Sequence, residues 1–65
     1  MFPGASSLIL DLLSTLKPGA VMPVGALVEA GGLFGVSGNN LRVTAARLLA
    51  AGRIARDERG YYRLG

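Results

Sequence analysis

A helix signal followed at once by a hairpin signal, over residues 35–64, most constrains what this chain can fold into. Ser37 can cap the helix, because a serine oxygen accepts a backbone N–H that has no partner in the first turn. Gly52 ends it, since glycine readily takes the left-handed conformation just past a helix. Residues 53–56 and 61–64 then predict two strands joined by a tight turn. The segment therefore predicts one helix followed by one antiparallel hairpin.

Positive charge is concentrated in the same segment. It contains all the arginines of the chain, namely Arg42, Arg47, Arg53, Arg56, Arg59 and Arg63. Its only carboxylates are Asp57 and Glu58, and Lys17 is the one basic residue outside it. A helix and a hairpin that share nearly all the positive charge indicate a surface for a polyanion, and this combination favours DNA.

Length and residue types limit the other function classes. A chain of 65 residues makes one small domain, which buries only about 60% of its unfolded surface, so its stability should be marginal unless it pairs or belongs to a larger protein. The sequence contains no Cys and no His, which removes disulfides, thiolate and imidazole metal ligands, and the catalytic sites built on them. Its four carboxylates form no acid–base pair, and no phosphate-binding glycine loop is present. We expect no enzyme activity, no cofactor and no metal.

Although 51% of the residues are hydrophobic, their arrangement along the chain is not that of a membrane-spanning helix. Residues 18–38 carry little charge but contain too many Gly and Pro residues for a lone spanning helix. No basic residue precedes the apolar run 8–10, and Asp11 interrupts it, which is the opposite of a secretory signal. We expect a cytoplasmic protein with no membrane partner.

The N-terminal part predicts an arm and a first helix. Residues 1–5 are expected to be a flexible arm, and residues 6–65 one domain. Ser6 or Ser7 can cap a helix over 8–16, which Lys17, Pro18 and Gly19 then end. Its apolar face is expected to contain Leu8, Leu12 and Leu16, with Ile9 and Leu13 beside them.

A second helix follows a short extended segment at 20–22. Pro23 suits its first turn, and its end is expected near Phe34, with apolar contacts from Leu27, Val28 and Phe34. Gly31 and Gly32 each weaken a helix by about 1 kcal/mol relative to alanine. Two interpretations are open and compatible: the helix breaks there, or Gly31 lets another helix approach closely.

The third helix follows after about three residues, which is the spacing of a helix-turn-helix. Its buried face is expected to contain Leu41, Ala45, Leu48 and Leu49. In the hairpin, Ile54, Tyr62 and Leu64 are expected to face the core, and Tyr61 and Arg63 to face outward. The predicted fold is α+β, a winged helix-turn-helix of three helices with a small antiparallel β-hairpin wing, in the order helix, strand, helix, helix, strand, strand.

The exposed face of the third helix offers groups that a DNA major groove can use. Asparagine can pair with adenine, arginine with guanine or phosphate, and valine methyls can meet thymine. The candidate residues are Ser37, Asn39, Asn40, Arg42, Val43 and Arg47. The alternative is a solvated helix face, with Asn39 and Asn40 acting only as caps.

The hairpin adds Arg56 and Arg59 as candidates for phosphate or minor-groove contact, and Tyr61 as a candidate for stacking or phosphate contact. The alternative is that both arginines serve solubility and pair with Asp57 and Glu58. For Tyr61 the preferred alternative is an exposed tyrosine on an edge strand.

Three stretches of the sequence also carry a family resemblance: SLILDLL at 7–13, FGVSGNNLRVTAARL at 34–48, and Gly52 with YYRL at 61–64. The central run is the most specific of them. Together, over about residues 6–65, they resemble the N-terminal domain of the PaaX-type repressors of phenylacetate catabolism.

This resemblance implies a bacterial transcriptional repressor whose N-terminal winged helix binds operator DNA, with Arg42 and Arg47 on the DNA-reading helix. Members of that family continue for several times this length, with further domains implicated in dimerisation and in the response to an acyl-CoA effector. The sequence stops at Gly65 and is expected to be a fragment or a short relative, so an acyl-CoA effector is expected only if a further C-terminal domain exists.

From these observations we expect sequence-specific binding to double-stranded DNA by a homodimer. The alternative is a winged helix that serves protein contact or dimerisation, which the apolar second helix favours. DNA binding should fall steeply with salt, whereas an apolar dimer should not.

Overall fold

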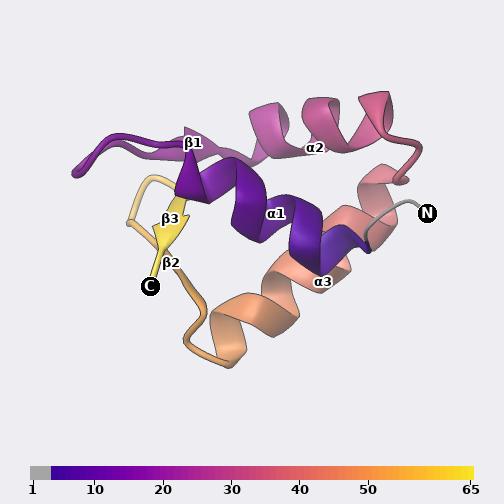
Figure 1. The fold of residues 1–65 in the computed structure, drawn as a ribbon. Coiled ribbons are helices and arrows are strands. Elements are labelled where there is room, and N and C mark those ends of the chain that lie inside the picture. Colours follow the sequence, from indigo (N-terminus) through magenta and orange to yellow (C-terminus); the bar gives the residue numbers. More distant parts are fainter. Residues whose placement is uncertain (1–3) are drawn as a thin grey trace.

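The computed structural model describes residues 4–65 and shows three helices and a small antiparallel sheet (Figure 1). The elements are α1 (Ala5–Ser14), β1 (Met22–Pro23), α2 (Val24–Leu33), α3 (Gly38–Ala50), β2 (Ile54–Arg56) and β3 (Tyr61–Leu64). Both the α+β class and the predicted order of elements are confirmed. The arrangement is that of a winged helix-turn-helix, with α2 and α3 as the helix pair and β2–β3 as the wing.

The sheet has the strand order β1-β3-β2, so the last strand of the chain lies in the middle. Met22 pairs with Tyr62 on one side, and Ile54 pairs with Leu64 on the other. Tyr61 therefore lies on the central strand, and its assignment to an edge strand is wrong. The sequence predicted an extended segment at 20–22 but did not show which strand it pairs with. Its partner, β3, is distant in sequence and is brought beside it only by the tertiary fold.

The core lies where α1 and α2 pack on α3 and the sheet closes one end. Its buried hydrophobic residues are Leu8, Ile9, Leu13, Leu27, Val36, Leu41, Ala45, Leu48, Ile54 and Tyr62. The predicted inward positions of α3 and of Tyr62 are confirmed, although Leu49 is only half buried. Leu64 is 42% exposed, so its predicted core position is wrong. It lines an open cavity of about 230 Å³ beside the end of α1, where no other side chain of residues 4–65 covers the end of β3.

Helix α1 begins earlier than the sequence indicated. Gly4 is its N-cap and provides no side-chain hydrogen bond, whereas Ser6 and Ser7, the predicted caps, lie inside the helix. Ala5 packs against the core, and such tertiary packing stabilises a helix more than a cap does. Of the predicted arm 1–5, residues 1–3 lie outside the described residues, and residues 4 and 5 cap and begin α1.

The end of α1 also differs, since the helix stops at Ser14 and not at Leu16. Two hydroxyl groups donate hydrogen bonds to the last carbonyls, Ser14 Oγ to Asp11 O at 2.6 Å and Thr15 Oγ1 to Leu12 O at 2.7 Å. Carbonyls satisfied in this way need no further helical turn.

Helix α2 is continuous through its two glycines, with Pro23 as its N-cap and not in its first turn. A Cβ on Gly31 would lie 2.5 Å from Leu41 Cδ1, so of the two interpretations the close helix approach is right and the break is wrong. Phe34 is 52% exposed and is not the buried contact expected. Val36 is buried, as predicted, and follows Gly35, whose φ of +80° turns the chain toward α3.

Candidate nucleic-acid interface

Helix α3 begins with the predicted cap. Ser37 Oγ accepts a hydrogen bond from the backbone N–H of Asn40 at 3.1 Å. Val28 of α2 lies against the first turn, since a Cβ on Gly38 would be 3.3 Å from Val28 Cγ1. The structural role of Ser37 at this site is therefore to cap α3 and fix where the helix begins.

The predicted residues of α3 lie on its solvent side. Asn39, Asn40, Arg42, Val43 and Arg47 are all exposed, with Val43 at 42%. Helical geometry places the two arginines about 140° apart around the axis, on opposite flanks of the exposed face. Asn39 and Val43 lie between them. The helix contains no carboxylate at any position.

The two asparagines are not equivalent. Asn40 Oδ1 accepts a hydrogen bond from Thr44 Oγ1 at 3.3 Å, which engages one of its two lone pairs and restrains the amide along the helix. A paired contact to adenine uses both the acceptor and the donor of the amide. Among the hydrogen bonds of residues 4–65, none engages the side chain of Asn39. Asn39 is therefore better placed for such a contact.

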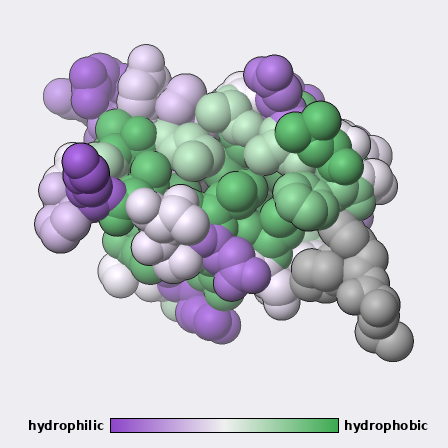
Figure 2. Space-filling model, turned by 45° about the horizontal axis from the view of Figure 1, so that its top comes forward, coloured by the Kyte–Doolittle hydropathy of each residue, from purple (hydrophilic) through white to green (hydrophobic). Residues whose placement is uncertain are grey.

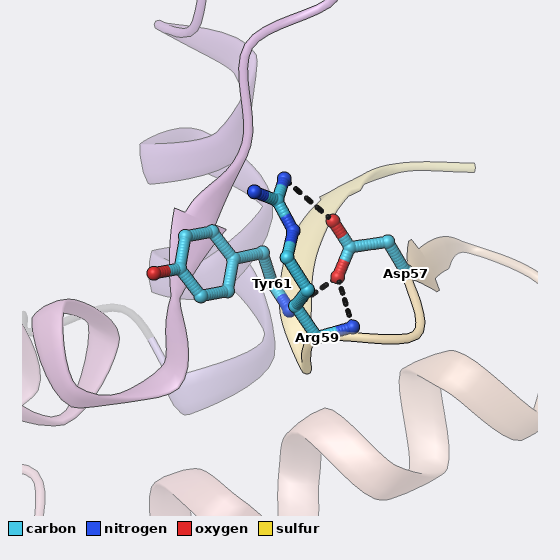
Figure 3. A network of polar contacts seen from close by, with 3 residues as sticks. All are labelled: Asp57, Arg59 and Tyr61. Carbon is cyan, nitrogen blue, oxygen red and sulfur yellow. Dashed lines mark hydrogen bonds and ion pairs between the residues drawn. The ribbon is translucent and has the colours of Figure 1, made fainter.

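The wing turn is organised by one carboxylate, which Figure 3 shows at its centre. Asp57 Oδ1 accepts hydrogen bonds from the backbone N–H groups of Arg59 at 2.9 Å and Tyr61 at 3.0 Å. Asp57 Oδ2 accepts from Arg59 Nη2 at 3.3 Å, the one ion pair among residues 4–65. The same guanidinium lies over the Tyr61 ring, 4.9 Å from its centroid. Gly60, with φ +86°, completes the turn as predicted.

These contacts lower the pKa of Asp57 below its ordinary value of 3.8, chiefly through the N–H of Tyr61 and against a smaller opposing effect of burial. The hydrogen bonds and the positive charge of Arg59 lower this pKa further. The lowered pKa means that Asp57 stays a carboxylate, and holds the turn, further into the acidic range than an ordinary aspartate would.

The two wing arginines lie on different faces of the hairpin. Arg56 is opposite Tyr62, whose ring is buried, so Arg56 lies on the face where the helices pack, at its exposed margin. Tyr61 points to the other face because side chains alternate along a strand. Arg59 lies over Tyr61 and therefore belongs to that outer face. Arg56 and Arg59, both predicted to contact DNA, are therefore not brought together on one face of the hairpin.

Comparison with known families gives a match over nearly the whole chain. The family model described as PaaX-like protein matches residues 4–65. The chain belongs to the PaaX-like family. Neither the curated proteins nor the solved structures contain a match to it. Membership in the PaaX-like family indicates a transcriptional regulator and agrees with the resemblance seen in the sequence.

Sequence reasoning missed the organising role of Asp57 in this PaaX-like domain and treated it only as a counter-charge. A signal was available, because Asp at the first position and Gly at the fourth are favoured in a tight turn, as in Asp57 to Gly60. Asp also commonly accepts backbone hydrogen bonds from residues that follow it.

Other kinds of site are not found in the part of the PaaX-like chain that the structure describes. No group of metal-binding side chains occurs among residues 4–65. Within the same residues, no helix has both the length and the apolar character needed to cross a membrane.

Proposed function

We propose that this domain binds double-stranded DNA sequence-specifically and does so as the DNA-binding part of a bacterial transcriptional repressor. The observation that carries the proposal is the exposed face of α3. It presents two amides and two guanidinium groups, and the helix has no carboxylate to repel phosphate. Arg42 and Arg47 have no ion-pair partner among the described residues, so both are available to an anionic ligand.

In this proposal α3 lies in the major groove. Asn39 and Val43, at the centre of the exposed face, contact base edges. Arg42 and Arg47 contact guanine or phosphates on the two sides of the groove, because they lie on opposite flanks of the helix. The wing contacts the sugar–phosphate backbone through Arg59, with Tyr61 beside it on the outer face, and through Arg56 at the margin of the opposite face.

Selection of bound sequences from a random duplex pool, followed by a salt series on the selected duplex, tests the proposal. Arg47→Ala should weaken binding, and Lys17→Ala is the matched control because it removes one exposed positive charge on the loop after α1. Specific binding that falls with salt and depends on Arg47 supports the proposal. No enriched sequence, or equal losses for the two variants, contradicts sequence-specific reading by α3.

A second candidate function is protein contact, including homodimerisation, at the end of α2. Leu33 is 84% exposed and Phe34 is 52% exposed, next to each other in sequence. Figure 2, which turns the α2 side toward the viewer, shows hydrophobic residues over a broad part of this face. Sedimentation velocity of the domain and of Leu33→Ser tests this candidate. Self-association that persists at high salt and is lost in Leu33→Ser supports it.

A further inference from the structure

The ion pair between Asp57 and Arg59 is a single, long contact at an exposed site. A single nitrogen, Arg59 Nη2, reaches Asp57 Oδ2, and their separation of 3.3 Å is long for a charge-assisted hydrogen bond. The Arg59 side chain is 68% exposed, whereas that of Asp57 is only 22% exposed. The guanidinium can therefore exchange its partner without moving the carboxylate.

The two oxygens of Asp57 have separate tasks. Oδ1 receives both backbone N–H groups and holds the turn, and Oδ2 receives only the guanidinium. The ring of Tyr61 supports the guanidinium from one side, as Figure 3 shows, so its position does not depend on Oδ2 alone. The hydrogen bonds to Oδ1 and the contact of Arg59 with the Tyr61 ring do not involve Oδ2 and can outlast the loss of the Oδ2 contact.

We infer that Asp57 occupies the place of a DNA phosphate at Arg59 and so attenuates the affinity of the wing for DNA. This inference rests on the proposed function. In the free domain Arg59 is paired with Asp57, and in the complex a phosphate oxygen replaces Asp57 Oδ2 while Oδ1 keeps the turn. The guanidinium group of Arg59 has several N–H donors, and only one of them contacts Asp57 Oδ2. A phosphate has several oxygens and can accept from two of these donors at once. Asp57 is thus a positioning residue that also competes with the ligand.

Asp57→Asn separates the two tasks. The amide oxygen of asparagine can still accept the two backbone hydrogen bonds, but its NH₂ group faces the guanidinium in place of Oδ2 and cannot pair with it. Glu58→Gln is the matched control, because it removes one negative charge from the adjacent, exposed position of the same turn. Neither the hydrogen bonds nor the ion pair of the wing involves the Glu58 side chain.

The experiment measures binding of the 65-residue chain to a labelled mixed-sequence duplex over a range of salt concentrations. Asp57→Asn should bind about two- to fivefold more tightly than Glu58→Gln at low salt, the equivalent of an exposed ion pair. Its salt dependence should be at least as steep as that of Glu58→Gln, because Arg59 then meets phosphate without a competitor. In an Arg59→Ala background, Asp57→Asn should gain no more than Glu58→Gln does.

Two outcomes overturn the inference while leaving the proposed function intact: equal affinities of Asp57→Asn and Glu58→Gln, or a gain that persists without Arg59. If neither the original chain nor any variant binds a duplex, the proposed function fails and the inference with it. Amide exchange at Tyr61 checks that the turn survives in Asp57→Asn. Asp57→Ala should lose protection at Tyr61, because it removes the acceptor as well as the charge.

Discussion

Gly31 of α2 and Leu41 of α3 are in such close contact that a Cβ on Gly31 would lie 2.5 Å from Leu41 Cδ1. Leu41 is fully buried, so its side chain has little room to move aside. The pair fixes how closely the two helices of the helix-turn-helix approach, and so helps to set the position of α3 relative to the rest of the domain.

Gly31→Ala should therefore destabilise the domain by about 1–3 kcal/mol, the range for inserting a methyl group into a packed core. Gly32→Ala is the matched control, because a Cβ there meets nothing within 4 Å. Alanine at this exposed helical position should stabilise the domain by up to about 1 kcal/mol. Thermal melts of the two variants measure both effects, and equal melting temperatures would contradict the close approach.

Leu48→Ala should destabilise the domain by about 2–5 kcal/mol, because it removes a buried side chain from the core face of α3, in the last turn of the helix. A loss of this size is comparable with the whole stability of a small domain. Ala46→Ser, on the exposed face of the same helix, should have little effect. If chemical denaturation finds Leu48→Ala no worse than Ala46→Ser, the burial assigned to α3 is wrong.

Asn39→Ala and Arg47→Ala should change sequence preference as well as affinity, each by about 1–3 kcal/mol at one position of the binding site. Asn40→Ala should have a smaller effect, because the Asn40 acceptor is engaged by Thr44. Binding to a panel of single-base variants of the selected duplex measures these effects. Equal weakening of binding to every duplex in the panel would show that Asn39 and Arg47 contact phosphates and do not read bases.

Arg56→Ala and Arg59→Ala should each reduce the salt dependence of DNA binding by up to about 0.9 log units per log unit of salt, with the preferred sequence nearly unchanged. Because the two residues lie on different faces of the hairpin, their effects should be separable. A salt dependence that is unchanged in one variant, with the circular dichroism spectrum preserved, would remove that arginine from the interface.

The wing should also respond to acid. Because the pKa of Asp57 is lowered in the folded domain, its contribution to stability is fully present above the ordinary pKa of 3.8 and is lost as the pH falls through the lower, folded value. The backbone amide signal of Tyr61, followed by NMR from neutral pH into this acidic range, should report the transition. Asp57→Asn should lack it, and persistence of the transition in that variant would assign it to another group.

The sequence was sufficient for the features that depend on local chemistry and periodicity. Ser37, Gly52 and Gly60 marked the cap, the helix end and the turn, and the spacing of Leu41, Ala45 and Leu48 identified the core face of α3. These residues act through their own backbone or through neighbours a few positions away, so their roles can be read without the tertiary fold.

Some of the missed features, such as the role of Asp57 in its turn, were local and had a signal in the sequence, whereas others depend on contacts distant in sequence. The early start of α1 reflects packing of Ala5 on the core, and the exposure of Leu64 reflects the open cavity beside it. Periodicity could not show whether the glycines of α2 break the helix or admit Leu41, since both need the same residue type. In the candidate site, the sequence supplied the residue types, but the different hydrogen bonding of Asn39 and Asn40 is seen only in the folded helix.

The middle position of β3 in the sheet has a consequence for how the domain folds. Pairing of Met22 with Tyr62 closes a loop of about 40 residues, so the hydrogen bonds between β1 and β3 form only at the entropic cost of closing that loop. Until the last strand arrives, neither β1 nor β2 has a neighbour to pair with. The hairpin β2–β3 closes only the short turn 57–60 and can form locally, whereas the three-stranded sheet is complete only when β1 joins β3 across the longer loop, so β1 should be the strand whose pairing depends most on the packed helices.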